Sequence, residues 1–111
     1  GIDGLSVVVH PANDWCDSLT VEQLKAIWEK GSEITTWNQI DPSWPSDPIE
    51  LYGSDAASGT YDYFQEVILG KDAAGEKIAF RNGYNPNDKD SELVEGVANT
   101  PGALGYFGYA F

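Results

Sequence analysis

The sequence predicts a single α/β domain over residues 1–111, in three layers with a mostly parallel sheet and helices on both faces. The chain of 111 residues is 41% hydrophobic, which suffices for one compact core but not for two. Aromatic residues make up 13% of the chain, more than a disordered chain carries. Strand-like and helix-like segments alternate along it, which is the pattern of parallel strands connected by packed helices.

The first half of the chain contains a strand, a helix and a long connection. A β-branched apolar run at residues 5–9 predicts a buried strand. Thr20 and Gln23 have the spacing of a capping box, and apolar residues then recur at helical spacing until Gly31. Residues 31–48 are rich in proline and turn-forming residues, so we expect an irregular connection, in which the tryptophans are packing residues.

The second half contains two further strands and two helices. The expected elements, in order, are a strand at 49–52 ended by Gly53, a helix from Ser58-Gly59-Thr60 to Gly70, loops over 71–87, a helix capped by Asp88 or Asp90 that stops near Asn99, and a strand at 103–107. Because both ends of the chain are strand-like and the sequence contains no methionine, we expect it to be a piece of a longer protein.

Charge and composition exclude several classes of function. Six basic residues against 18 acidic ones give a net charge of −12, which would repel nucleic acid. No apolar run reaches the roughly 18 residues that a membrane span needs. Cys16 is the single cysteine, so no internal disulfide is available, and we expect it to be a small, partly buried apolar residue.

One motif is suited to binding an anion. Ser58-Gly59-Thr60 follows a strand and a short loop and opens a helix. Backbone N–H groups at a helix start point outward, the helix dipole adds positive potential there, and the two hydroxyls can also donate. The alternative is that Ser58 only caps the helix.

No catalytic or metal-binding cluster is evident in the sequence. His10 is the only histidine and follows a strand, where it has no expected role as a base. Asp62 and Glu66 lie four residues apart on the expected helix, with no His or Cys at ligand spacing, so we expect a solvated face. We therefore expect no cofactor, no metal and no enzymatic activity.

Six segments, in order, resemble those of the phosphate-binding proteins of bacterial ABC transporters. They are residues 1–9 (GIDGLSVVV), 19–28 (LTVEQLKAIW), 51–53 (LYG), 58–64 (SGTYDYF), 93–97 (LVEGV) and 101–110 (PGALGYFGYA). The resemblance implies one lobe of a periplasmic-binding-protein-like fold, corresponding to the second domain that this family inserts into its first.

The resemblance also implies a function. Ser58, Gly59 and Thr60 would donate hydrogen bonds to inorganic phosphate, and the missing first domain would complete the site. The whole protein would deliver phosphate to an ABC permease from a periplasmic or other extracytoplasmic position, and a lipid anchor in the full-length protein is left open. The alternatives are a binder of a related tetrahedral oxyanion and a structural or interaction domain that binds no anion.

Two departures from the family pattern bear on selectivity. Ala57 stands where many members have an acidic residue, and Ser54 stands where others have an arginine. Asp55 is the nearest remaining carboxylate and is a weak candidate for the site. Arg81, the only arginine, is a secondary candidate because a guanidinium suits oxyanions; the alternative is a surface salt bridge.

Overall fold

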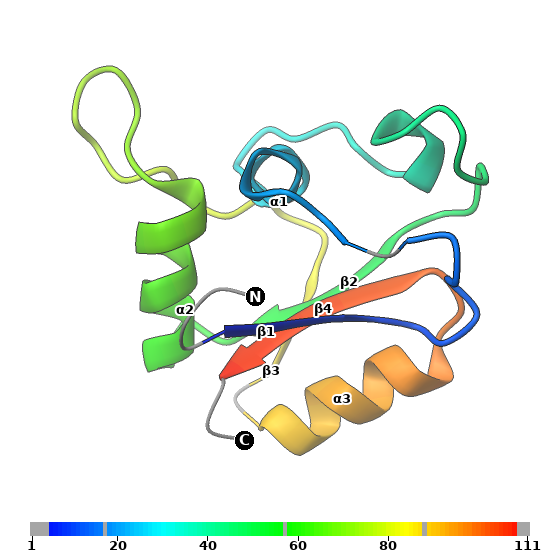
Figure 1. Cartoon of the computed structure of the whole chain (residues 1–111). Coiled ribbons are helices and arrows are strands. Elements are labelled where there is room, and N and C mark those ends of the chain that lie inside the picture. The colour runs from blue at the N-terminus through cyan, green and yellow to red at the C-terminus, as the bar shows by residue number, and fades with distance from the viewer. Residues whose placement is uncertain (1–4, 17, 57, 88, 109–111) are drawn as a thin grey trace.

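The computed structural model describes residues 5–16, 18–56, 58–87 and 89–108. In chain order the elements are β1 (Leu5–Val9), α1 (Val21–Trp28), a 3₁₀ helix (Trp37–Gln39), β2 (Glu50–Ser54), α2 (Gly59–Phe64), a π-helical turn (Gln65–Leu69), β3 (Asn85–Asn87), α3 (Asp90–Asn99) and β4 (Ala103–Gly108) (Figure 1). The alternation of strands and helices that the sequence predicts is confirmed.

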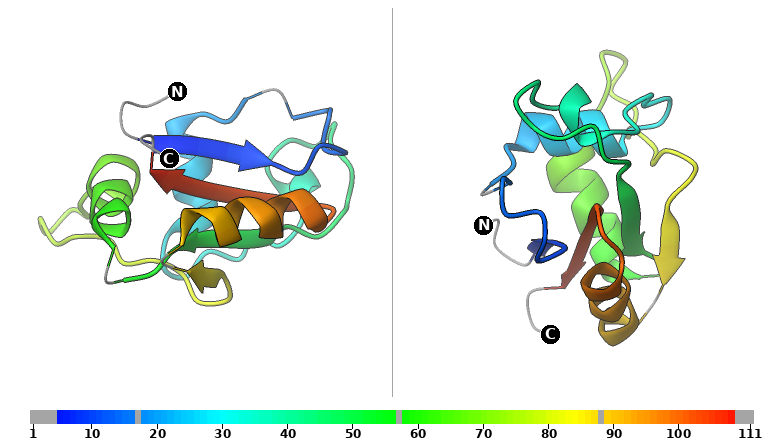
Figure 2. Two further views of the ribbon diagram at one scale, coloured as in Figure 1. Left: turned by 90° about the horizontal axis from the view of Figure 1, so that it is seen from below. Right: turned by 90° about the vertical axis from the view of Figure 1, so that its right-hand side faces the viewer.

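The four strands form one sheet in the order β1-β4-β2-β3. β2 runs parallel to both β3 and β4, whereas β1 is antiparallel to β4, with Leu5 opposite Gly108. α1 and α2 lie over one face of this sheet and α3 over the other, as the views in Figures 1 and 2 show. The predicted three-layer α/β fold with a mostly parallel sheet is therefore confirmed.

Aromatic side chains fill the space between the sheet and α1 and α2. The Trp28 ring meets Phe64 of α2 and Tyr106 of β4 edge-on, with ring centroids 5.7 and 5.1 Å apart. All three side chains are fully buried. Burial of these large rings supplies much of the apolar contact that holds the two helices on the sheet.

The sequence predicted that Gly53 ends the strand, but β2 continues through Ser54. A Cβ at Gly53 would lie 2.8 Å from Cε1 of Tyr106 and 3.1 Å from Cη2 of Trp28. The glycine thus serves close packing within the strand and is not a stop signal.

The opposite face is covered by α3, which buries Leu93 and Val97. Gly96 lets α3 approach the ring of Tyr52, since a Cβ there would come 2.6 Å from Cε2 of that ring. The Tyr52 hydroxyl forms a hydrogen bond of 2.9 Å with the Thr100 hydroxyl, just beyond the end of α3.

Two further expectations need correction. β3 lies within residues 71–87, where only loops were expected. Its sequence, Asn-Pro-Asn, has no apolar alternation that would predict a strand, and it forms by pairing with β2. Asp90 is the first residue of α3 and not its cap, since Lys89 occupies the N-cap position with no side-chain capping bond. The other candidate cap, Asp88, lies outside the described residues.

The other expectations on helix ends and packing are confirmed, except that α1 ends at Trp28 and does not extend to Gly31. Thr20 and Gln23 form the reciprocal capping box at the start of α1. Gly70, with a φ of 70°, ends the helical segment after α2. Cys16 is buried in the core, and Trp37 and Trp44 pack with Trp15 in the connection that precedes β2.

Candidate functional site

The carboxyl ends of the three parallel strands gather at one edge of the sheet. β2 ends there at Ser54 and β3 at Asn87, and the antiparallel β1 begins there. α2 starts directly beyond β2, at this same edge (Figure 1). Ligands of open α/β sheets bind outside the carboxyl ends of the strands, so this is where a ligand is expected.

Directional hydrogen bonds shape the turn between β2 and α2. The Asp55 amide donates to the Asn87 carbonyl at 3.1 Å, and the Ser58 amide donates to the Asp55 carbonyl at 2.9 Å. The Ser58 side chain then accepts from the Thr60 amide at 3.0 Å and caps α2. The capping role, offered above as the alternative for Ser58, is thus present in the structure.

The outer side of the turn is open to solvent. Gly59 is exposed, and a Cβ built on it would meet no atom within 4 Å. Ser58 and Thr60 are half-buried. The helix that begins here continues through the π-helical turn to Leu69, so its dipole points a positive end at the turn. The arrangement leaves room for an anion to approach the helix start.

The two other predicted residues of the turn differ in what the structure describes. Asp55 lies within the turn and is half-buried. Burial raises the pKa of the neighbouring Tyr84 hydroxyl, and the charges of Tyr61 and Asp55 raise it further. Ala57 lies outside the described residues.

Arg81 has a structural position that the sequence did not reveal. Its Nη1 donates to the carbonyl oxygens of Ile34 at 2.7 Å and Ile27 at 3.0 Å, and its Nε donates to the Asn82 carbonyl at 3.2 Å. Burial lowers the pKa of the guanidinium, which stays charged near neutral pH. These bonds join the end of α1 to the following connection, and a contact of Arg81 with an anion stays a prediction.

Two tyrosines beneath the turn were missed by the sequence reasoning. The Tyr84 hydroxyl donates to the Ser54 carbonyl at 3.2 Å. The Tyr106 side chain is fully buried, and its hydroxyl has no hydrogen-bond partner among the described residues. The sequence predicted that Tyr106 lies in a strand, and only the fold shows that its side chain is buried between the sheet and the helices.

The other candidate residues form no second site. The His10 ring accepts from the Ala12 amide at 3.0 Å within a local turn. Asp62 and Glu66 are exposed on the helix, and within the described part of the chain no group of three His, Cys, Asp or Glu side chains could hold a metal ion. None of the helices described is long and apolar enough to cross a bilayer.

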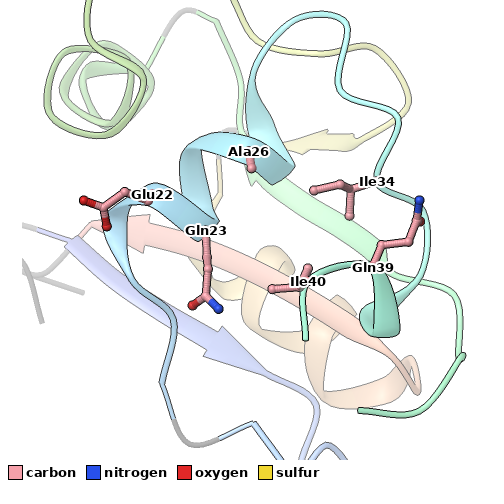
Figure 3. A pocket seen from close by; sticks show the side chains of 6 residues that line it. All are labelled: Glu22, Gln23, Ala26, Ile34, Gln39 and Ile40. Atoms are coloured by element: carbon pink, nitrogen blue, oxygen red, sulfur yellow. The ribbon is translucent and has the colours of Figure 1, made fainter. Parts of the chain in front are cut away.

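A shallow depression of about 200 Å³ lies between α1 and the 3₁₀ helix (Figure 3). The residues that line it are Glu22, Gln23, Ala26, Ile34, Gln39 and Ile40. None of them belongs to the turn at residues 54–60, and the side chains include no arginine, lysine or histidine to attract an anion. This depression is therefore not the candidate anion site.

Comparison with known proteins adds three findings. The family described as the PBP superfamily domain matches residues 1–111. Protein SphX of Synechocystis sp. is 44% identical to the chain, and phosphate-binding protein PstS of Staphylococcus saprophyticus is 38% identical. Each match covers 98% of this chain, but only 32% and 31% of the respective relative, so the chain spans about a third of their length.

Solved structures give the same result. The structure of a possible phosphate binding protein from Planctomyces limnophilus has a TM-score of 0.86 and 47% identity, over 97% of this chain and 36% of its own. An ABC-type phosphate transport receptor from Vibrio cholerae has a TM-score of 0.75 and 28% identity, over 97% of this chain and 42% of its own.

Proposed function

The chain belongs to the PBP superfamily, and from that premise we propose that it is one lobe of a phosphate-binding protein and contacts inorganic phosphate through Ser58, Gly59 and Thr60. One of its relatives, PstS, is a phosphate-binding protein, and SphX is a second relative. The similar solved structure from Vibrio cholerae is an ABC-type phosphate transport receptor. The proposal concerns capture of the anion, with no bond in it broken.

The turn at the start of α2 is the observation that carries this proposal. It stands at the carboxyl edge of the parallel strands, its glycine is exposed, and the positive end of the helix dipole faces outward. The Ser58 oxygen accepts the hydrogen bond that caps the helix, and its O–H group is still able to donate a hydrogen bond to an anion.

A second lobe would complete the site. Leu5 of β1 pairs with Gly108 of β4 at the same edge where α2 begins. The chain spans about a third of the length of its relatives SphX and PstS. We propose that a first domain lies there, adds further donors to phosphate, and that the whole protein serves an ABC permease from a periplasmic or other extracytoplasmic position.

Asp55 and Arg81 are secondary members of this proposal. Asp55 lies in the turn, where its carboxylate could accept the proton of hydrogen phosphate. Arg81 would have to reach the anion with the part of its guanidinium that the carbonyls of Ile27 and Ile34 leave available.

A phosphate titration of the 111-residue chain, followed by amide NMR shifts, tests the proposal. The amides of Ser58, Gly59 and Thr60 are expected to shift most. Because one wall of the site is absent, we expect a dissociation constant on the order of millimolar or weaker. Sulfate is titrated in parallel, since it has the same shape but no proton to donate at neutral pH.

Each outcome has a distinct meaning. Equal shifts with both anions would favour a general binder of tetrahedral oxyanions over a phosphate-selective lobe. Shifts concentrated around Asp62 and Glu66 would contradict the assigned turn. No shift with either anion at any concentration that the sample tolerates would favour a structural or interaction domain.

A further inference from the structure

Asn82 and Gly83 lie in an exposed bend between Phe80 and the start of β3. Asn82 is the only asparagine in the sequence that is followed by glycine. In such a pair the backbone amide of the glycine can attack the side-chain carboxamide of the asparagine, because glycine has no side chain to block the approach. Whether the pair reacts in a folded protein depends on the exposure and the hydrogen bonds of the two groups.

The structure leaves both reacting groups accessible. Asn82 and Gly83 are exposed, and a Cβ built on Gly83 would meet no atom within 4 Å. Among the residues that the structure describes, neither the Asn82 carboxamide nor the Gly83 amide has a hydrogen-bond partner. Gly83 has a φ of 86°, a conformation that residues with a side chain rarely adopt, so the bend itself requires the glycine.

Asn99 is an exposed asparagine that the fold holds in place. It is the last residue of α3, and its Nδ2 donates to the Glu95 carbonyl at 2.9 Å. The amide of the following residue, Thr100, donates to the Val97 carbonyl. Because the carboxamide and the following amide are both engaged, and Thr100 is β-branched, the same attack is hindered there. Exposure alone therefore does not distinguish the two asparagines, but their hydrogen bonds do.

The Arg81 guanidinium lies where it favours the reaction at Asn82. Its Nε donates to the Asn82 carbonyl at 3.2 Å. This carbonyl belongs to the same peptide group as the Gly83 amide, so when the amide loses its proton the negative charge is shared with the carbonyl oxygen. A hydrogen bond from the guanidinium to that oxygen stabilises the charge where it develops.

We infer that Asn82 is a site of spontaneous deamidation in the folded chain and that Arg81 promotes the reaction. The Gly83 nitrogen loses its proton and bonds to Cγ of Asn82, and the NH2 group of the carboxamide takes up a proton and leaves as ammonia. The product is a cyclic succinimide. Water then opens one of its two C–N bonds, which gives aspartate when the bond to Cγ breaks and isoaspartate when the bond to the backbone carbonyl carbon breaks. The overall reaction consumes water, releases ammonia and oxidises nothing.

The isoaspartate product changes the backbone between two anchored side chains. Nη1 of Arg81 donates to the Ile34 carbonyl at 2.7 Å, and the Tyr84 hydroxyl donates to the Ser54 carbonyl at 3.2 Å. Isoaspartate inserts a methylene group into the backbone between Arg81 and Tyr84, so the two bonds cannot both keep their geometry. We therefore expect this product to loosen the segment that supports the end of β2.

The test follows deamidation of the 111-residue chain at mildly alkaline pH, by peptide mapping with mass spectrometry. The exchange of NH2 for OH is expected on the peptide that contains Asn82, at a rate close to that of the same chain unfolded in urea. The peptide that contains Asn99 is the control within the same sample and is expected to react much more slowly. In Asn82→Gln the ring would need an additional atom, so the peptide that contains this position is expected to stay unmodified.

Two comparisons test the steps that depend on the structure. Arg81→Met is expected to slow the reaction of the folded chain about fivefold, the effect of one net hydrogen bond, and to change the rate in urea little. Loss of the other Arg81 bonds would loosen the segment and speed the reaction, so a slower rate identifies the bond to the Asn82 carbonyl. The purified isoaspartate form is expected to have a lower urea midpoint than Asn82→Asp, which carries the same charge on an unaltered backbone.

Opposite results would overturn the inference. If Asn82 reacts far more slowly in the folded chain than in urea, the fold protects it and the bend is not a site of deamidation. If Arg81→Met reacts at the wild-type rate or faster, Arg81 does not promote the reaction. If the isoaspartate form and Asn82→Asp have the same urea midpoint, the inserted methylene group does not loosen the segment.

Discussion

The connection at residues 31–48 and the turn between β2 and α2 are both irregular, but tryptophan packing contributes only to the first. In the connection, Trp37 packs against Trp15 and Trp44 with ring centroids 4.9 and 5.9 Å away, and its Nε1 donates to the Gly102 carbonyl at 3.0 Å. The turn contains no tryptophan and is shaped by single hydrogen bonds to Asn87 and Tyr84.

This difference separates a structural loop from a binding loop. Burial of large rings is strong and needs little directional precision, and in the connection it adds to hydrogen bonds such as the one from Trp37 to Gly102. The turn keeps polar groups near water on its outer side and depends on the direction of a few bonds. Changes in the connection should therefore affect stability, and changes in the turn should affect anion binding more than stability.

The largest effect is expected for Trp37→Ala. Trp37 is fully buried, and the change removes its contacts with two rings and its bond to Gly102. We expect a loss of about 3–5 kcal/mol in the free energy of unfolding, measured by urea denaturation. Asn38→Ala, at the exposed neighbouring position, serves as the control and should change stability little. A small loss for Trp37→Ala would show that packing does not hold the connection.

Arg81→Met is expected to have the next largest effect. It removes the bonds from Nη1 to the carbonyls of Ile27 and Ile34, so we expect a loss of about 2 kcal/mol in the free energy of unfolding. Lys30→Met removes the same charge from an exposed side chain and is the control.

A phosphate titration of the same pair tests the second role of Arg81. A weaker phosphate affinity than that of Lys30→Met would support a contact with the anion. Equal affinity in the two variants would remove Arg81 from the site and leave it as a residue that joins α1 to the connection.

Ser58→Ala and Thr20→Ala form a matched pair at two helix starts. Each removes an oxygen that accepts from a backbone amide at 3.0 Å, Thr60 in one case and Gln23 in the other. Both should lose about 1 kcal/mol in the free energy of unfolding, the usual effect of a lost N-cap. Only Ser58→Ala should reduce the phosphate-induced amide shifts at Gly59 and Thr60. Equal phosphate responses in the two variants would argue that Ser58 is a cap alone.

The smallest effect concerns the pH dependence of stability at Asp41. The Ser43 amide and hydroxyl donate to Asp41 at 2.9 and 2.8 Å, and these bonds lower the pKa of the carboxyl in the folded chain. Its contribution to stability is therefore present above the ordinary pKa of an aspartate, near 3.8, and is lost as the pH falls through the lower folded value.

Asp41→Asn should therefore lower stability slightly at pH 7 and less at pH 2, because the wild-type carboxylate loses its charge as the pH falls. Urea denaturation at both pH values measures the difference. Because Asp41 is only half-buried, the effect should shrink further in high salt. An equal loss of stability at both pH values would show that the charge of Asp41 does not cause the effect.

The sequence by itself determined the features that depend on neighbours along the chain. The capping box of Thr20 and Gln23, the stop at Gly70 and the alternation of strands and helices are all confirmed. Each depends on backbone geometry within a few residues, so spacing alone predicts it. The position of Ser58-Gly59-Thr60 at a helix start follows from the same local rules.

Only the tertiary structure decided the features that join distant segments. β3 exists because β2 offers it hydrogen-bond partners, Arg81 bonds to Ile27 from 54 positions away, and the Tyr84 hydroxyl donates to the Ser54 carbonyl from 30 positions away. No local sequence pattern predicts these pairs. Burial and cross-strand register bring the partners together, and the residues next to each partner in the sequence do not indicate the other. Packing therefore decided which polar groups lie beneath the turn, and with them how the candidate site is supported.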